Sequence, residues 1–311
     1  MTLSVIIVSW NVKDLLRDCL RSVFASPLDP PPQVIVVDNA SADGSPAMVR
    51  REFPQVELIA SPRNLGYAGG NNLGAAAATG DALLLLNPDT RLHPDTLRLL
   101  RDYLLAHPEA GVVGPRLLWP DGSVQSSRRR FPTPATLFWE STLLEQWFPG
   151  NGAARRYRFE DVPPDRPLAV DWLVGAALCI RRQAWEAAGP LDESFFMYFE
   201  ETDWCRRCAL AGWEIHYLPQ AKVVHYEGQS SGQVAAARTL RFQRSKIRYA
   251  EKWFGRGWAF AVRLFLLGTF GLQWLEEAAK WLIGHKRPLR RERMFACGQV
   301  LRGLAGVKSE E

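Results

Sequence analysis

The sequence predicts an α/β protein in which a mostly parallel, Rossmann-like sheet is flanked by helices and followed by a C-terminal helical extension. Two observations predict the sheet. Short apolar segments alternate with segments of helical spacing over residues 3–86, and polar clusters follow the apolar segments directly. The third observation, a basic and amphipathic segment at 235–311, predicts the extension.

The first half of the chain has the clearest pattern. Apolar runs predict buried strands, which are 3–10, 34–37, 56–60 and 83–86. Helical spacing predicts the intervening helices, which are 13–24, 46–53 and 69–78, the last closed by Gly80. Strands that alternate with helices in this way indicate a parallel sheet, whose ligands bind beyond the carboxyl ends of the strands.

The second half is less regular. Its expected elements are a helix at 93–106, a strand pattern over 170–181, helices at 182–188 and from 203 to about 211, and a strand at 223–225. The stretch 128–167 is rich in Arg, Pro and aromatic residues with weak periodicity, so it predicts a long, partly ordered loop. We therefore expect a catalytic domain over 1–234 and a tail over 235–311.

Composition indicates a globular chain. Of 311 residues, 47% are hydrophobic and 12 are Trp, which is enough material for a packed core. Five scattered cysteines are typical of a reducing cytoplasm rather than of a disulfide framework. Because the N-terminus lacks a basic region and a cleavage site, we expect no signal peptide and a cytoplasmic catalytic domain.

Charge is distributed unevenly along the chain. Residues 235–311 carry 16 Lys and Arg against 6 Asp and Glu, whereas residues 1–234 carry 22 against 27. A basic tail on an acidic body suggests an anionic partner. The interleaved aromatic and aliphatic residues favour a membrane face over nucleic acid, although a solvated basic helix explains the charge equally well.

The tail also contains an apolar run at 257–275, interrupted by Arg263. A central Arg makes spanning a bilayer costly, so we expect two amphipathic helices, over 257–275 and 274–283, on the inner face of the plasma membrane. Basic residues after 284 would then meet anionic headgroups. The alternative is that these helices pack on the catalytic domain or form a homodimer interface.

Two polar clusters near the N-terminus are candidate nucleotide contacts. Asp38, with Asn39 and Ser41, ends a strand, where a carboxylate can accept hydrogen bonds from a ribose or a base; an ordinary turn explains the same residues. The second cluster runs from Arg63 to Asn71, and its glycines, its helix N-terminus and Arg63 favour an anion. Its spacing is not that of the dinucleotide-binding fingerprint.

A third cluster, Asn87-Pro88-Asp89, follows the all-apolar strand at 83–86. Mg²⁺ and Mn²⁺ prefer oxygen ligands and usually share them with substrate phosphates. Asp89 is therefore a candidate metal ligand, and a simple Asn-Pro turn is the alternative.

The last candidates lie in the second half of the chain. Glu200 and Glu201 follow the aromatic run 195–199, which should raise a carboxyl pKa and suits a general base. His225 ends a strand and is a candidate second metal ligand or a core histidine.

The order of these blocks resembles the family 2 glycosyltransferases of the GT-A fold, particularly their bacterial rhamnosyltransferase-like branch. The blocks run from Val5-Ile6-Ile7-Val8-Ser9-Trp10-Asn11, through the clusters at 36–41, 64–71 and 86–89, to Trp172-Leu173-Val174-Gly175-Ala176, 191–201, Gly212-Trp213 and His225. The resemblance spans about residues 3–232.

The resemblance implies a role for each block. The half at about 1–115 would bind the nucleotide-sugar, and the half at 116–234 would face the acceptor. Implied substrate contacts are Asp38, Asn39, Ser41, Arg63, Asn64, Gly66, Asn71, Asn87, Trp172 and Gly175. Asn87-Pro88-Asp89 takes the place of the family's D-x-D metal motif and keeps only its last carboxylate. Metal binding would rest on Asp89 and His225.

The resemblance further implies an inverting transfer from a dTDP- or UDP-sugar, with rhamnose as the leading sugar, to a glycan or polyprenyl-linked hydroxyl in cell-envelope polysaccharide synthesis. Glu201 stands where the family has its basic Asp, and Glu200 is the alternative base. Two other functions fit the residues: a nucleotidyltransferase that uses the same sheet and metal, and a non-catalytic nucleotide-sugar-binding module.

Overall fold

The computed structural model describes residues 1–226 and 235–306. The chain folds into two compact units. The first comprises Met1–Phe131, Arg158–Phe196 and Glu200–Ser230, and the second comprises Pro132–Tyr157, Met197–Phe199 and Ser231–Glu311. Residue 234, where we expected the catalytic domain to end, lies outside the described residues. The segment 132–157 belongs with the C-terminal helices rather than with the sheet.

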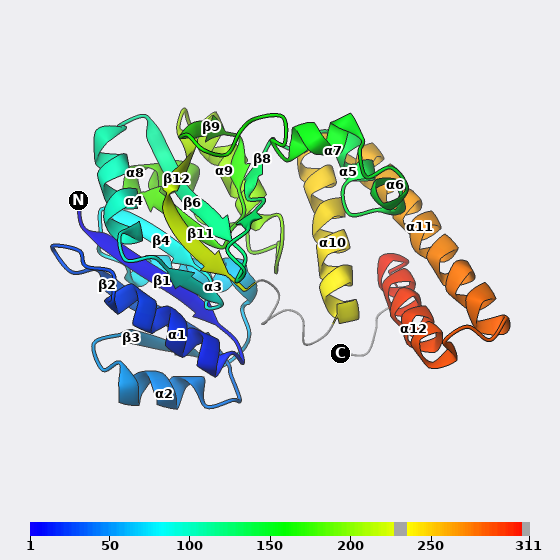
Figure 1. Ribbon diagram of the computed structural model, residues 1–311, viewed down its shortest axis with the longest axis horizontal. Helices are drawn as coiled ribbons and strands as arrows, with labels where there is room; N and C mark the ends of the chain where they lie inside the picture. The colour runs from blue at the N-terminus through cyan, green and yellow to red at the C-terminus, as the bar shows by residue number, and fades with distance from the viewer. Residues whose placement is uncertain (227–234, 307–311) are drawn as a thin grey trace. The chain divides into compact units, whose positions relative to one another are not determined.

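One mixed sheet forms the centre of the first unit (Figure 1). Along its main path the strands are β3 (Glu57–Ser61), β2 (Gln33–Asn39), β1 (Leu3–Ser9), β4 (Ala82–Leu86), β11 (Ala177–Arg181), β6 (Ala110–Leu118), β12 (Glu214–His225) and β5 (Thr90–Leu92). Off this path, β7 (Val124–Gln125) pairs with β6, and β9 (Leu168–Val170) pairs with β12. A separate two-stranded ribbon joins β8 (Arg128–Arg129) to β10 (Trp172–Leu173).

The register of the sheet brings the carboxyl ends of its first strands to one edge. β1 runs parallel to β2 and β4, with Ser9 opposite Asp38 and Ile7 opposite Leu86. β11 is antiparallel to both of its neighbours, so the expected mostly parallel sheet is confirmed with one reversed strand in its middle. β6 was not among the strands expected from the sequence. The expected boundary near residue 115, between the nucleotide-sugar half and the acceptor half, falls inside this strand.

Helices cover both faces of this sheet. The helices of the first unit are α1 (Lys13–Phe24), α2 (Ser45–Glu52), α3 (Gly66–Ala77), α4 (Thr96–Ala106), α8 (Arg182–Ala188) and α9 (Glu200–Leu210). Because strand side chains alternate between faces, Val5 and Ile7 of β1 point into the core shared with α1, α2 and α4. Ile6 points to the opposite face, against α3.

Two glycines let α3 lie directly on β1. A Cβ added at Gly74 would lie 2.4 Å from the Cγ2 atom of Ile6, and one at Gly70 would lie 2.6 Å from the Cγ1 atom of Val8. Gly80 was expected to close this helix, but α3 ends at Ala77. A Cβ at Gly80 would lie 2.6 Å from the backbone nitrogen of Ser4, so this glycine serves close packing instead.

The second unit is helical. It contains α5 (Pro134–Trp139), α6 (Leu143–Trp147), α7 (Gly152–Tyr157), α10 (Ala235–Phe254), α11 (Arg256–Leu282) and α12 (Arg287–Leu304). The expectation of a long, partly ordered loop over 128–167 is therefore wrong. The side chains of Thr133 and Thr142 cap α5 and α6, but both helices are too short to show an apolar period in the sequence.

The expectation of two amphipathic helices over 257–283 is also wrong, because α11 is continuous through this range. The range contains no proline that would break it. Among the described residues α11 is the one helix long and apolar enough to cross a membrane. A buried ion pair of 2.8 Å between Glu277 and Arg290 joins α11 to α12.

Gly74→Val should lower the free energy of unfolding by about 1–3 kcal/mol, because the added methyl groups overpack the contact with Ile6. Chemical denaturation measures this change. Gly268→Val is the matched control, since Gly268 is also helical and a Cβ there meets nothing within 4 Å. Equal losses in the two variants would contradict the close approach of α3 to β1.

Candidate active site

In the first cluster, Asp38 has a side-chain oxygen that is available to accept a hydrogen bond. It is 2% exposed, and its Oδ2 atom accepts a hydrogen bond of 3.0 Å from the Ser41 backbone. Its Oδ1 atom is buried without a hydrogen bond to any described residue. Leaving a carboxylate oxygen buried and unsatisfied is costly, so this atom is suited to receive a ligand's donor or a cation.

The neighbours of Asp38 hold the loop in place. The hydroxyl of Ser41 accepts from the Asn11 backbone at 2.9 Å, and the Asn11 side chain accepts from the Ala42 backbone at 2.7 Å. The Asn39 side chain donates to the Gly66 carbonyl at 3.0 Å. Asn39 and Ser41, both predicted substrate contacts, thus form hydrogen bonds that hold the protein's own loops in place.

The glycine-bearing loop before α3 is tied to the loop before α9. The backbone nitrogen of Tyr67 donates to the Phe196 carbonyl at 2.9 Å. Gly66 has a φ of 73°, and a Cβ there would lie 2.3 Å from that same carbonyl oxygen. The conformation and the contact both require glycine. Gly66 therefore has a packing role whether or not it also contacts substrate.

The other predicted contacts of this loop differ in exposure. Arg63 is exposed at the surface. Asn64 accepts from the Gly66 backbone at 2.9 Å, and the buried Asn71 donates to the Tyr67 carbonyl at 2.9 Å. Arg63 is thus the residue of this loop that presents a charge to solvent, as an anion contact requires.

Asp89 and His225 face each other across the site. Both are buried, with the Oδ1 atom of Asp89 3.5 Å from the Nε2 atom of His225. The pairing of β5 with β12 causes this proximity, because Thr90 lies opposite His225 and the Tyr226 backbone donates to the Asp89 carbonyl at 2.9 Å.

Gln125 orients the imidazole of His225. Its Oε1 atom lies 3.0 Å from Nδ1 of His225. An amide oxygen only accepts, so Nδ1–H donates to Gln125 and Nε2 faces Asp89. A carboxylate oxygen and a ring nitrogen that face each other can both ligate a metal ion. The residues therefore fit a divalent cation with one nitrogen and one carboxylate ligand.

Two protein ligands are few for Mg²⁺ or Mn²⁺, but such ions usually complete their shell with water and substrate phosphates. Asn87 lies beside Asp89, and its backbone nitrogen donates to the Ala176 carbonyl at 2.9 Å. The register of β4 and β11, with Ala177 opposite Leu86, thus brings the segment that contains Gly175 alongside the turn at Asn87.

Gly175 connects this region to the two glutamates at the start of α9. The Tyr67 hydroxyl donates to the Gly175 carbonyl at 2.7 Å. A Cβ added at Gly175 would lie 3.2 Å from that hydroxyl oxygen and 3.5 Å from the Oε1 atom of Glu201. Glycine at this position therefore allows the Tyr67 hydroxyl and the Glu201 side chain to approach the backbone closely.

Glu200 and Glu201 lie in different environments. Glu200 is 4% exposed, and its Oε2 atom has no hydrogen bond to a described residue. Burial, and secondarily the charge of Glu201, raises the pKa of Glu200 well above its ordinary value. Glu201 is half-buried. The same two glutamates, after burial, raise the pKa of Tyr67, so its hydroxyl remains a donor.

The remaining residues of this region are engaged with the protein. Trp172 is 7% exposed, and its indole nitrogen donates to the Arg130 carbonyl at 2.9 Å. Asp203 pairs with Arg207 at 3.0 Å, one turn further along α9.

A series of contacts therefore joins most of the predicted site. It runs from Asn39 through the Gly66 loop to Gly175 and Glu201, and from Asn87 to Asp89 and His225. Gln125 was not predicted as a site residue, because no local sequence pattern marks it. The contact of Tyr67 with Gly175 was not predicted either, although Tyr67 lies inside a loop that was a candidate site.

The chain belongs to glycosyl transferase family 2, whose family model matches residues 4–163. This confirms the resemblance, and the chain is accordingly a glycosyltransferase. An N-acetylglucosaminyl-diphospho-decaprenol L-rhamnosyltransferase of Mycobacterium tuberculosis is 31% identical over 87% of this chain and 91% of its own length. The rhamnosyltransferase WbbL of Escherichia coli is 26% identical over 71% of this chain and 82% of its own.

Solved structures share the fold. A mannosyltransferase from Pyrobaculum calidifontis in complex with GDP-mannose and Mn²⁺ aligns with a TM-score of 0.53 at 17% identity, over 98% of this chain and 86% of its own. TarS residues 1–349 of S. aureus align with a TM-score of 0.53 at 14% identity, over 99% and 90%. The likeness confirms the GT-A fold.

Glu200→Gln should change the pH dependence of stability. A carboxyl whose pKa is raised on folding binds more protons in the native state, so its ionisation destabilises the fold as pH rises above its unfolded pKa. The variant, which cannot ionise, should gain stability relative to the wild type between pH 5 and pH 8, as ~4.3 is the ordinary Glu pKa. Denaturation at both pH values measures this.

Glu186→Gln is the control, since Glu186 is exposed on α8, outside the cluster. A stability difference between Glu200→Gln and the wild type that stays constant with pH would contradict the raised pKa.

Proposed function

We propose that this chain is an inverting glycosyltransferase that moves a deoxyhexose, rhamnose, from dTDP to a hydroxyl of a polyprenyl-diphosphate-linked glycan. The observation that supports the transfer activity is the pair of glutamates at the start of α9, the buried Glu200 and the half-buried Glu201, of which Glu201 lies beside Gly175. They lie at the same sheet edge as Asp89 and His225. The names of the two rhamnosyltransferase relatives support the sugar, and the name of the mycobacterial one supports the lipid-linked acceptor.

Glu201 is the general base in this proposal. Its neighbour Glu200 is kept protonated by burial, so it cannot accept a proton readily near neutral pH. Glu201 is half-buried, and its side chain lies beside Gly175. Its carboxylate removes the proton of the acceptor hydroxyl as that oxygen attacks C1 of the sugar, from the face opposite the leaving diphosphate.

Asp38 and Arg63 bind the donor in this proposal. The buried Oδ1 atom of Asp38 accepts a hydrogen bond from the nucleoside, and the exposed Arg63 contacts the phosphates. A divalent cation held by Asp89 and His225 would supply positive charge against the nucleoside-diphosphate leaving group. The imidazole ligand favours Mn²⁺ over Mg²⁺, and two GT-A structures that resemble this one contain Mn²⁺.

Release of dTDP from dTDP-rhamnose should require a polyprenyl-diphosphate-linked acceptor, and Glu201→Gln should lower kcat by ~10²–10⁴-fold. A panel of nucleotide-sugars scored by nucleoside-diphosphate release measures both. Glu200→Gln should retain much more activity, because Glu200 is already protonated, and Glu186→Gln on α8 is the control for surface charge.

Release of pyrophosphate from a nucleoside triphosphate would instead identify a nucleotidyltransferase. Nucleotide-sugar binding without turnover, unchanged in Glu201→Gln, would identify a non-catalytic module.

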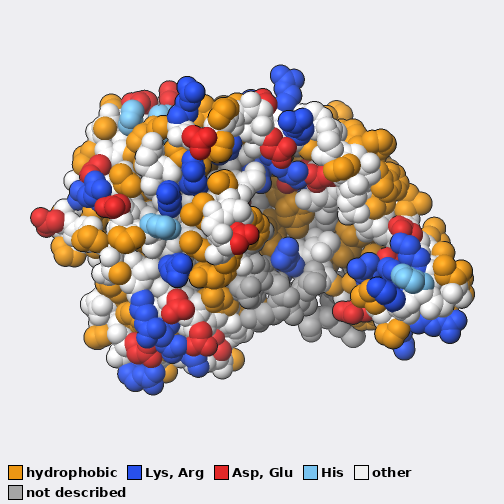
Figure 2. Space-filling model, viewed as in Figure 1, with side chains coloured by type: hydrophobic (Ala, Val, Ile, Leu, Met, Phe, Trp, Pro, Cys, Tyr) orange, Lys and Arg blue, Asp and Glu red, His pale blue; other side chains and the backbone are white. Residues whose placement is uncertain are grey.

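We also propose that the second unit associates peripherally with the cytoplasmic face of an anionic membrane. One side of α11 packs within the unit through residues such as Val262 and Leu266, while its other side exposes large apolar residues. Those more than half exposed are Phe260, Leu264, Leu272, Leu275 and Leu282. Figure 2 shows hydrophobic side chains along α11 and basic ones over the turn into α12.

A hollow of about 640 Å³ at this turn combines both kinds of group. Arg287 and Arg291 line it together with Trp281 and Phe295. Guanidinium groups beside aromatic rings fit the phosphate and the upper acyl region of an anionic lipid. Arg263 is exposed on α11 and would lie in hydrocarbon if the helix crossed the bilayer. The packed side of α11 and Arg263 together favour a surface position.

Replacing Leu275 and Leu282 with Glu should weaken vesicle binding at least tenfold, since each buried Leu contributes about 1.5–3 kcal/mol. Flotation of the full chain with phosphatidylglycerol-containing vesicles measures binding. Leu105→Glu, on an equally exposed leucine of α4, is the control. Unchanged flotation of the double variant would show that this face of α11 does not contact the membrane.

A further inference from the structure

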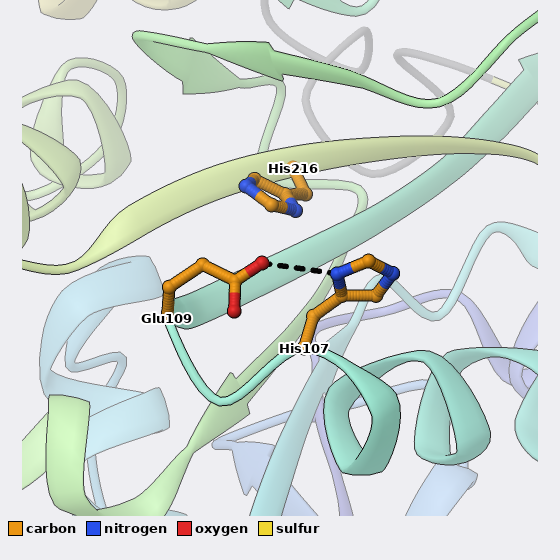
Figure 3. A group of neighbouring side chains, drawn as sticks. All are labelled: His107, Glu109 and His216. Atoms are coloured by element: carbon orange, nitrogen blue, oxygen red, sulfur yellow. Dashed lines mark hydrogen bonds and ion pairs between the residues drawn. The ribbon is translucent and has the colours of Figure 1, made fainter.

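A second group of potential metal ligands lies in the first unit, at the end of β12 opposite to His225. It consists of His107 at the end of α4, Glu109 in the turn before β6, and His216 near the start of β12 (Figure 3). One ligand atom from each lies within 4.8 Å of the others. His225 lies nine positions further along β12 than His216, which at ~3.3 Å per residue is roughly 30 Å.

The backbone around these side chains is fixed. The Ala110 nitrogen donates to the His107 carbonyl at 3.1 Å, and the Glu214 nitrogen donates to the Glu109 carbonyl at 3.1 Å. The guanidinium of Arg181 donates to three carbonyls of the same turn, those of Leu104, His107 and Ala110. These backbone contacts therefore hold His107 and Glu109 beside β12 without a bound ion.

The two imidazoles are oriented by further contacts. The Tyr103 hydroxyl lies 3.0 Å from Nδ1 of His216, and its ring stacks on that of His107 at 4.1 Å between centroids. Because a carboxylate only accepts, Nε2–H of His216 donates to Glu214 at 2.7 Å, and the Tyr103 hydroxyl donates to Nδ1. Nδ1 of His107 lies 3.0 Å from Glu109.

We propose that His107, Glu109 and His216 bind a zinc-class transition metal ion, with water in the fourth position and Glu214 as the hydrogen-bond partner that orients His216. Two imidazole nitrogens and one carboxylate suit Zn²⁺, which binds nitrogen and oxygen at about 2.0–2.2 Å in a tetrahedron. That geometry sets neighbouring ligand atoms roughly 3.3 Å apart, close to the 3.0 Å between His107 and Glu109.

The side chains of His107 and Glu109 can adjust to an ion, because they are 40% and 46% exposed, whereas His216 is 8% exposed and held by Tyr103. A hydrogen-bond partner that orients a metal-binding histidine affects the affinity of the site for the metal. The bound ion links the end of α4, the start of β6 and the start of β12, so its role is to stabilise the first unit, and it stays apart from sugar transfer.

The ligand chemistry of the two sites differs. The Asp89–His225 position offers one nitrogen and one carboxylate and depends on a substrate to complete its shell. The cluster around His216 offers three protein ligands, which water can complete, so it needs no substrate. Zinc binding in the absence of nucleotide therefore distinguishes the second site from the first.

The test is a zinc titration of the full chain after treatment with a chelator, in competition with a chromophoric chelator and without nucleotide. All variants carry His225→Gln, so that zinc at Asp89 is not counted. The His225→Gln chain should bind one Zn²⁺. Adding His107→Gln should weaken binding at least tenfold, and adding His93→Gln, an exposed histidine outside the cluster, should not.

Thermal unfolding gives a second readout. Zinc at 100 times its Kd should raise Tm by roughly 5 °C or more in the His225→Gln chain, and much less once His107→Gln is added. Glu109→Gln is the second variant, and its half-exposed side chain makes misfolding an improbable cause of lost binding. No stoichiometric zinc, or binding that His107→Gln and Glu109→Gln leave unchanged, would show a hydrogen-bonded cluster without a metal.

Discussion

The approach of Asp89 to His225 is the interaction on which the site depends. A buried carboxylate oxygen and an imidazole nitrogen meet at 3.5 Å, and Gln125 orients the ring that faces the carboxylate. The pairing of β5 with β12 holds the two side chains together, because it places Thr90 opposite His225. In the proposed function this position receives a divalent cation, which takes one oxygen and one nitrogen ligand from the protein.

Most polar residues at the same sheet edge maintain the loops rather than face a ligand. Asn39, Ser41 and Asn71 form hydrogen bonds with neighbouring backbone. Asp38 has a buried oxygen without a hydrogen bond to a described residue, and the Glu201 side chain lies beside Gly175. Loops that are already held in place favour preorganised catalysis, because they do not have to be ordered again when the donor binds.

The parts of this structure that the sequence predicted are those with a local physical signal. The all-apolar run ending at Asn87 could only be a buried strand, so the position of Asp89 at a carboxyl end followed from the parallel sheet. Gln125 had no such signal, because its role exists only through the pairing of β7 with β6 and the resulting contact with His225.

The same distinction explains the errors. The helices α5 and α6 are shorter than two apolar periods, so only their capping threonines marked them. The glycines of α3 suggested an anion cradle, yet Gly70 and Gly74 serve its close packing on β1, a contact between segments more than 60 residues apart. Long-range pairing of this kind leaves no periodicity within one segment.

The affinity of the full chain for Mn²⁺ in the presence of dTDP, measured by titration of free Mn²⁺, tests the central claim most directly. Asp89→Asn should abolish binding, and Gln125→Leu should weaken it ~10–100-fold, because Gln125 orients the ligand His225. Glu201→Gln should leave it unchanged. Mn²⁺ binding that survives both Asp89→Asn and Gln125→Leu at full strength would contradict the account.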